Sequence, residues 1–301
     1  MITAAALAVL AAACAVGSWR FTRAAWTPRA PRLAIFLWQS LGVAWGLATT
    51  GAMLAYAVQP YDLGVLPGLI AFAQGETPAT PWDALHVLAM IAGVTALAVL
   101  VAVLLAAGVQ ALRARHRHRT LLALIAHDDP AIPGVRVLDH PGAAAYCVPG
   151  LRSQVVVSEG ARRLLSQDEL AAVLAHEAAH VRERHDLVLL PFAALRRALP
   201  WSKVVADAQA QVELLIEMAA DDRARRYCSP RRLATALLRF GSAGAMPTPH
   251  GMLGVHAHNV MARVNRLVKP GPELATTVRY GYLTLAVTLL TAAPTLWVYQ
   301  L

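Results

Sequence analysis

The chain has 301 residues, of which 57% are hydrophobic, and a formal net charge of +9. Its mean hydropathy of +0.49 excludes a single soluble globule, whereas the charges in its middle exclude a protein that lies in the membrane throughout. The three cysteines, Cys14, Cys147 and Cys228, form no CxxC pair. We therefore expect neither a disulfide framework nor a thiolate metal site, and interpret them as small apolar residues.

Four apolar stretches are candidates for membrane spans, each of which needs roughly 20 residues. They are residues 2–17, 33–58, 85–109 and 280–300. The first charge, Arg20, follows the first apolar run, so this run is expected to be a retained span and not a cleaved secretory signal. The sequence thus predicts three transmembrane helices within residues 1–112, a polar domain over 113–278, and a fourth transmembrane helix over 279–301.

The charges beside these stretches predict the orientation of the chain. The loop 59–84 has three acidic residues and no Lys or Arg, whereas residues 18–32 contain four arginines and residues 113–119 read RARHRHR. Because basic residues stay on the cytoplasmic side of a cell membrane, we expect a cytoplasmic domain and external N- and C-termini. A nucleic-acid patch is the alternative for the basic run, but a span boundary explains it better, so no direct nucleic-acid binding is expected.

The polar domain is expected to contain a few short strands followed by helices. A helix should run to residue 127, and the strand-like runs are 135–139, 144–148 and 154–158. Ser166 and Glu169 form a capping box, which predicts a helix that begins at Gln167 and includes the histidines discussed below. Further helices are expected over residues 203–226 and from Pro230 to Gly241, and residues 187–201 are expected to form a helix on the membrane surface.

The segment VLAHEAAHVRERHD, residues 173–186, is typical of a metal site. His176 and His180 lie four residues apart, so a helix places both on one face, where a single zinc ion can bind both imidazoles. Glu177 adjoins the first histidine and can reach a water molecule beside the metal. A pattern this short also arises by chance, so more residues must agree.

A third ligand is expected from the segment EMAADDRA. Glu217 and Asp221 lie four residues apart on the predicted helix; Glu217 would bind the metal, and Asp221 would accept a hydrogen bond from a ligating histidine. The alternative is that Glu217, Asp221 and Asp222 pair with Arg223, Arg225 and Arg226 on a solvated face, but the apolar neighbours make such a face less natural. Four further residues have open roles. His185 and Asp186 would support the ligands or end an exposed helix, and His256 or His258 would stabilise an oxyanion or lie in solvent.

These motifs resemble gluzincin-type membrane peptidases, a group that includes the HtpX and CAAX-prenyl endopeptidase family and the BlaR/MecR family of antirepressor peptidases. ELAAVLA before HEAAH, and Glu217-x-x-Ala220-Asp221-x-x-Ala224 after it, are similar to both families. AAYCVPG, QVVVSEGARRLLSQDELAAVLAHEAAHVRERHD and ARVNRLV (262–268) are closer to the BlaR/MecR type. The resemblance implies one zinc ion per chain, bound by His176, His180 and Glu217, with Glu177 as general base. It also implies a protease domain in the cytosol.

The predicted fold is mainly α, a multi-pass membrane protein with four transmembrane helices and a cytosolic α+β gluzincin-like metallopeptidase domain with a small sheet. The favoured function is a zinc metalloendopeptidase that cleaves a cytosolic winged-helix repressor of the BlaI/MecI type in a stress or antibiotic response. An extended substrate would pair with the edge of strand 144–148.

Two other functions stay open. One is a membrane-protein quality-control protease of the HtpX kind. The other is a non-catalytic sensor or scaffold with a structural zinc site, against which an intact Glu177 argues. The BlaR/MecR receptors carry an external sensor after the last span, so a chain that stops at Leu301 is not expected to sense beta-lactams through one. Whether the chain forms homo-oligomers also stays open.

Overall fold

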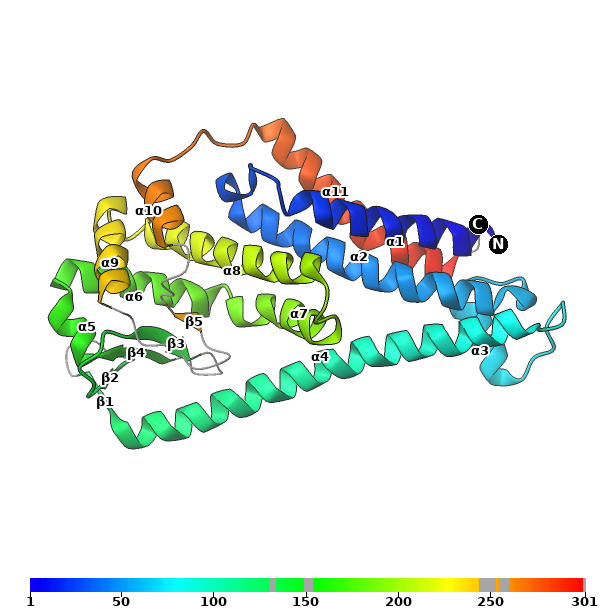
Figure 1. Ribbon diagram of the computed structural model, residues 1–301, viewed down its shortest axis with the longest axis horizontal. Helices are drawn as coiled ribbons and strands as arrows, with labels where there is room; N and C mark the ends of the chain where they lie inside the picture. The colour runs from blue at the N-terminus through cyan, green and yellow to red at the C-terminus, as the bar shows by residue number, and fades with distance from the viewer. Residues whose placement is uncertain (130–133, 149–153, 244–252, 255–259, 300–301) are drawn as a thin grey trace.

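The computed structural model describes residues 1–129, 134–148, 154–243, 253–254 and 260–299 (Figure 1). His256 and His258 therefore lie outside the described residues. Long helices run along the longest axis of the molecule, and the small sheet with its covering helices lies at the end opposite the two chain termini (Figure 1). The molecule is mainly α-helical, as the sequence predicts.

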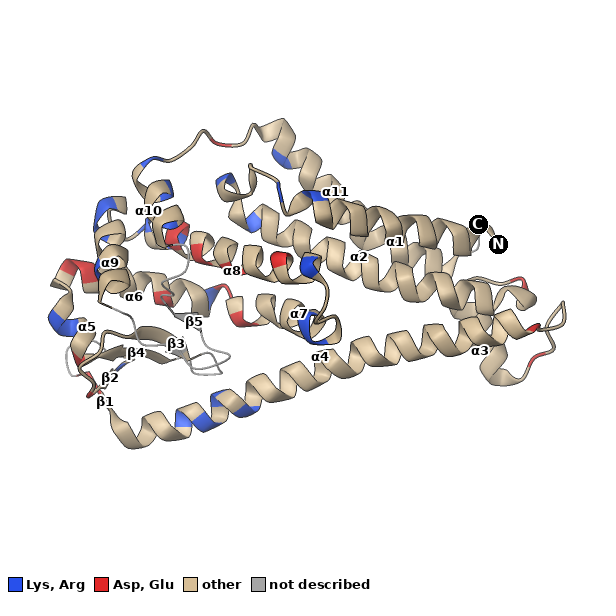
Figure 2. Ribbon diagram, viewed as in Figure 1, with Lys and Arg blue, Asp and Glu red and all other residues tan. Residues whose placement is uncertain are grey.

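Among the described residues, four helices are long and apolar enough to cross a membrane by length and composition. They are α1 (Ile2–Phe21), α2 (Pro31–Ala57), α4 (Ala84–Ile125) and α11 (Thr276–Val298). Helix α2 lies at the centre of this group and contacts the other three. Its small residues permit close approach: Gly51 lies under the indole of Trp297, which donates a hydrogen bond to the carbonyl oxygen of Leu47. Figure 2 shows that the middle parts of these helices carry almost no Lys, Arg, Asp or Glu.

Helix α4 is one continuous element, where the sequence led us to expect a span over 85–109 and a separate helix up to residue 127. It contains 42 residues, which corresponds to about 63 Å at 1.5 Å per residue. Asp83 and His86 form a capping box at its beginning. The loop between α2 and α4 also contains a short helix, α3 (Val65–Gln74), that the sequence analysis did not predict.

The sheet follows directly after α4. Its strands are β1 (Ala126–Asp128), β2 (Val135–Leu138), β3 (Ala145–Val148), β4 (Gln154–Ser158) and β5 (Leu253–Gly254), in the order β1-β2-β4-β3-β5. Strands β2 and β4 are parallel, and the other pairs are antiparallel. The three expected strands are confirmed within a residue at each end. The expectation of a free edge on strand 144–148 is wrong, because β3 pairs with β4 on one side and with β5 on the other.

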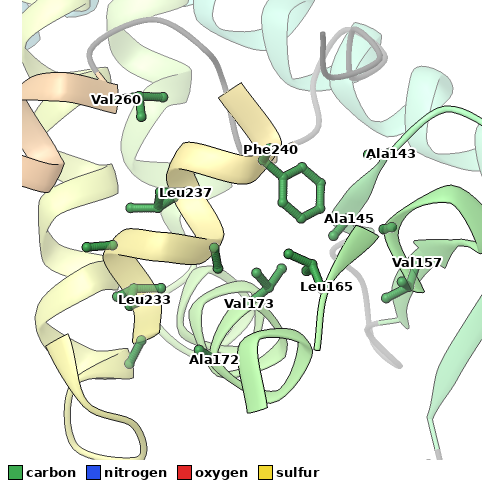
Figure 3. Close-up of a cluster of buried hydrophobic side chains, with 14 of the residues drawn as sticks. Ala143, Ala145, Val157, Leu165, Ala172, Val173, Leu233, Leu237, Phe240 and Val260 are labelled. Atoms are coloured by element: carbon green, nitrogen blue, oxygen red, sulfur yellow. The ribbon is translucent and has the colours of Figure 1, made fainter. Parts of the chain in front are cut away.

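Helices cover one face of the sheet and form the core with it. These helices are α5 (Glu159–Leu164), α6 (Gln167–Arg182), α9 (Pro230–Ser242) and α10 (Val260–Val268). Val173 of α6 and Phe240 of α9 meet Ala145 and Val157 of the sheet in a buried cluster (Figure 3). The capping box at the start of α6 is confirmed, since Ser166 and Glu169 each accept a hydrogen bond from the backbone N–H of the other.

A helical hairpin, α7 (His185–Ala198) and α8 (Lys203–Ala224), connects this core to the long apolar helices. The chain enters α7 through Arg184, whose φ of 50° lies in the left-handed region. Helix α7 contacts α4 and α8, with Phe192 buried against the core around α2, and it runs along the long axis of the molecule (Figure 1). The expected helix is thus present, with Phe192 and Ala194 buried, and its position on a membrane surface stays a prediction.

Candidate metal centre

Two packed helices place the predicted ligands side by side. Helix α6 contributes His176, Glu177 and His180, and α8 contributes Glu217 and Asp221; all five residues are buried. Small residues at the contact, including Ala179 of α6 and Ala219 and Ala220 of α8, are fully buried. Because the distance between packed helices depends on the side chains between them, these alanines let the two sets of polar groups approach each other.

Three potential ligand atoms converge on one point. His176 Nε2 lies 3.0 Å from His180 Nε2 and 3.3 Å from Glu217 Oε2, and His180 Nε2 lies 3.4 Å from Glu217 Oε1. Ligand atoms about 2.0–2.1 Å from a tetrahedral zinc ion are about 3.3 Å apart, so the observed separations fit such an ion. The His-His-Glu group could therefore hold a metal ion.

The charge of the site also fits a divalent cation. Three buried carboxyl groups, those of Glu177, Glu217 and Asp221, surround one buried guanidinium, that of Arg263. With the carboxyl groups ionised and both histidines in the neutral form that binds a metal, the net charge is minus two. Buried charges are stable only when they are compensated, so a cation of charge two completes this arrangement.

A proton on His176 provides part of that compensation when no metal is bound. Burial alone would lower the pKa of His176, but hydrogen bonds to Asp221 and Glu217 outweigh it and raise the pKa to about 9. Burial, together with the positive groups around the ring, holds the pKa of His180 well below its ordinary value. Metal binding would therefore displace a proton from His176.

Asp221 lies behind the first histidine. Its Oδ1 atom is 3.0 Å from Nδ1 of His176, on the side of the ring away from Glu217. Burial opposes ionisation of Asp221, yet the adjacent Arg263 and His176 lower its pKa to about 2. An ionised carboxylate at this position fixes the tautomer of the imidazole, because it accepts a hydrogen bond from one ring nitrogen and leaves the other free to bind a metal.

Arg263 of α10 is the central residue that the sequence analysis missed. It donates two hydrogen bonds to Asp221, at 2.9 and 2.6 Å, and its Nη1 atom lies 2.7 Å from Glu217 Oε2. A signal was present in the sequence: Val260, Val264 and Leu267 form the buried face of α10, and Arg263 falls on the same face. An arginine on an apolar helix face indicates a buried acidic partner.

The remaining candidates form a second group at the end of α6. His185 Nδ1 lies 2.9 Å from His180 Nδ1, and His185 Nε2 lies 3.4 Å from Glu183. Asp186 pairs with Arg115 of α4 and with Arg184. His185 and Asp186 are buried, so the exposed helix end that was one reading for them is wrong.

The sequence left two alternatives for three acidic residues of α8: a role at the metal site, or ion pairs with arginines on a solvated face. Glu217 and Asp221 face the histidines and are buried, so pairing with arginines on a solvated face is wrong for them. That reading holds for Asp222, which pairs with Arg225 and Arg266. Helix periodicity separates these residues, because Glu217 and Asp221 share a face and Asp222 lies 100° away from the latter.

Two comparisons with known proteins agree with this geometry. Residues 111–221 match the family model described as Peptidase family M48. The chain is also 40% identical over 78 residues to a protein named Protease HtpX homolog from Aeropyrum pernix, which corresponds to 24% of each chain. The chain thus spans about a quarter of the length of the curated relative it matches. The family match contains His176, Glu177, His180, Glu217 and Asp221 and ends before Arg263. These comparisons support an HtpX-like M48 metallopeptidase segment within the chain.

Proposed function

We propose that this chain is a membrane zinc metalloendopeptidase. The observation that carries the proposal is the convergence of His176, His180 and Glu217 on one point, with the buried Glu177 next to the first ligand. One zinc ion per chain is expected there, because the three ligand atoms and the local charge suit a single divalent cation. The similarity of residues 111–221 to Peptidase family M48 supports the same activity.

The residues of the site divide the work of peptide hydrolysis. Zinc, when bound, supplies the Lewis acidity that polarises a peptide carbonyl and makes a water molecule more acidic. Glu177 takes the proton from that water and transfers it to the leaving amine, as general base and then general acid. Asp221 orients His176, and Arg263 holds Glu217 and Asp221 in place. His185 orients His180 from the opposite side of the ring.

We propose a cytosolic winged-helix repressor of the BlaI/MecI type as the substrate. The BlaR/MecR-like motifs support this choice, and so do the basic flanks, which predict that residues 113–278 lie on the cytosolic side of the membrane and both termini outside. A reporter enzyme that folds only outside the cytosol should be active when it is fused after Leu301, and one that works only in the cytosol should be inactive there. The reverse pattern would overturn both the topology and the substrate.

The decisive experiment compares Glu177→Gln with Glu213→Gln. Glu213 is an exposed residue of α8, so its substitution is a matched control for charge and size. With the repressor co-expressed, Glu177→Gln should keep its zinc and lose about 10²- to 10⁴-fold in cleavage, the contribution typical of general base catalysis. Repressor of equal length and amount in wild-type and Glu177→Gln cells under every inducing stress would contradict the repressor as substrate.

A quality-control protease is the second candidate, favoured by the similarity to a protein named Protease HtpX homolog. It predicts that damaged membrane proteins accumulate in the Glu177→Gln strain while the repressor is unaffected. A non-catalytic scaffold with a structural zinc site predicts that neither change occurs. The same variant therefore separates all three functions.

A further inference from the structure

A basic pocket lies between the long apolar helices and the metal centre. It has a volume of about 660 Å³. Its walls come from the α1–α2 connection with the first residues of α2 (residues 25–33), from the end of α10 with the α10–α11 connection (residues 265–274) and from the beginning of α11. Asp222 of α8 and Arg225, directly after α8, complete it. None of the predicted metal ligands lines it, so the pocket is separate from the candidate metal centre.

The pocket is strongly positive. Six of its lining residues are cationic and two are acidic: Arg29, Arg32, Arg225, Arg266, Lys269 and Arg279 against Asp222 and Glu273. Asp222 is held by a bidentate pair with Arg266 at 2.8 Å. Within the described parts of the chain, Arg29, Lys269 and Arg279 have no ion pair, and all three are exposed. The pocket thus presents cations in excess that have not been neutralised by the protein.

The pocket lies where three candidate spans end together. Helix α1 ends at Phe21, α2 begins at Pro31 and α11 begins at Thr276, and the lining segments follow or precede these residues directly. Trp26 stacks on Tyr282 of α11 with ring centroids 4.2 Å apart, and Tyr280, two residues earlier in the same helix, is exposed. Tryptophan and tyrosine are enriched at the headgroup level of a bilayer, so this end of the spans matches the membrane surface. Figure 2 shows basic residues at the beginnings of α2 and α11 and around α10.

The walls of the pocket are already fixed by hydrogen bonds. Arg266 donates to the carbonyl oxygen of Pro28 at 2.6 Å and so ties α10 to the α1–α2 connection. Arg32 binds Glu183 through two hydrogen bonds and also donates to the carbonyl oxygen of Ala219 in α8. A preformed site loses less conformational entropy when it binds a ligand than a site that must first be ordered.

We propose that this pocket binds a phosphate-bearing anion, the headgroup of an anionic phospholipid or a small soluble phosphate. Guanidinium and ammonium groups recognise phosphate oxygens by charge-assisted hydrogen bonds, and basic pockets between transmembrane helices accept anionic lipid headgroups. The position of the pocket at the span ends favours the lipid. The proposal requires only that α1, α2 and α11 cross the membrane, and it is independent of peptidase activity.

Native mass spectrometry of the full chain in detergent tests the proposal with phosphatidylglycerol as the probe. Lys269→Gln/Arg279→Gln should weaken binding by about fivefold per lost cation, roughly 25-fold for the pair. The matched control is Arg113→Gln/Arg117→Gln, which removes two exposed arginines from α4 that do not line the pocket. This control should change the affinity less than about twofold. The exchange Lys269→Arg/Arg279→Lys keeps both charges and should bind like the wild type.

Three further arms identify the chemistry. Phosphatidylglycerol should bind more tightly than phosphatidylcholine, and diacylglycerol, which has no phosphate, should not bind the pocket. If glycerol 3-phosphate bound as tightly as phosphatidylglycerol, the pocket would still be a phosphate site, but its ligand would be a soluble phosphate. Equal losses in the two double variants, or equal binding of diacylglycerol and phosphatidylglycerol, would overturn the proposal.

Discussion

Two groups of charged and histidine residues adjoin each other, one around α6 and one at its C-terminal end, and they differ in their charge balance. The metal-site cluster consists of His176, Glu177, His180, Glu217, Asp221 and Arg263. The span-contact cluster consists of Arg32, Arg115, Glu183, His185 and Asp186. The two touch through His180 and His185, whose Nδ1 atoms are 2.9 Å apart. Both contain histidines and carboxylates, so the residue types alone do not tell them apart.

The two clusters differ in how far arginines balance the charge of their carboxylates. In the span-contact cluster each carboxylate has an arginine: Arg32 from the start of α2 binds Glu183, and Arg115 from α4 binds Asp186. In the metal-site cluster three carboxyl groups share one arginine, and the nitrogen and oxygen atoms converge on one point. A balanced cluster fastens helices together, whereas a buried cluster with excess negative charge has room for a metal ion.

The largest effect should come from removing the single arginine of the metal-site cluster. Arg263→Gln leaves buried carboxylates without their cation, which should lower the free energy of unfolding of the metal-free protein by about 3–5 kcal/mol. Urea unfolding in the presence of a chelator measures this change. Zinc should restore part of the loss, because it compensates the same carboxylates. A cost no larger than that of Arg32→Gln would refute the charge imbalance on which the comparison rests.

Removal of the third ligand should affect the metal-site cluster alone. Glu217→Gln should weaken zinc binding by more than about 100-fold, since loss of even an outer hydrogen-bond partner costs 10- to 100-fold. The control is Glu183→Gln in the span-contact cluster, which should leave zinc content unchanged. Elemental analysis of the purified proteins gives the stoichiometry. If Glu217→Gln kept one zinc ion per chain with unchanged affinity, Glu217 would not be the third ligand.

Stability at low pH should depend on Asp221, the buried carboxylate next to His176. The pKa of Asp221 is about 2 in the folded chain against an ordinary 3.8, so its contribution to stability is complete above pH 3.8 and is lost as the pH falls toward 2. The shift corresponds to about 2 kcal/mol. Asp221→Asn should remove this part of the pH dependence of stability in the metal-free protein. Urea unfolding at a series of pH values measures the change.

The pH dependence of Glu183 provides the comparison. Burial opposes its ionisation, but His185 and Arg32 lower its pKa to about 2. Its partner Arg32 has 44% of its side chain exposed, so water screens the pair and Glu183→Gln should flatten the acid limb less than Asp221→Asn. A steeper effect from Glu183→Gln would reverse the ranking of the two clusters.

The smallest effect should come from Arg32. Exposed ion pairs contribute about 0–1 kcal/mol, so Arg32→Gln should lower the free energy of unfolding by no more than that. Zinc content should not change. Loss of zinc from Arg32→Gln would mean that its hydrogen bond to the Ala219 carbonyl oxygen positions Glu217, and the two clusters would then act as one.

The site was readable from the sequence wherever its geometry is local. His176 and His180 share a helix face by their spacing, and Ser166 marks the beginning of that helix, so both followed from the periodicity of an α-helix. Arg263 was missed because its partner Asp221 lies 42 residues away, and no local pattern specifies which helices pack. Strands β1 and β5 were missed for a related reason: segments of three and two residues become strands only by pairing with β2 and β3.

The sequence also did not predict that one helix, α4, connects the apolar segment to the polar domain. Basic residues 113–119 mark a boundary in composition, which suggested a break in structure. The helix continues through them, because Arg, His and Leu are all compatible with helical backbone and Arg115 finds a buried partner in Asp186. A change in polarity along a chain therefore marks a change in composition without marking the end of a helix.

Helix α4 is long and leads directly into the sheet, so it can transmit a tilt to the sheet. A hydrocarbon core is about 30 Å thick, which is roughly half of the 63 Å length of α4. Its far end passes without a loop into β1, and Arg115 connects its shaft to Asp186 at the start of α7. A rigid rod of this length that tilts by about 5° moves its tip by about 5 Å. Because α4 passes into β1 without a hinge, a tilt of the helix about its other end carries the sheet with it.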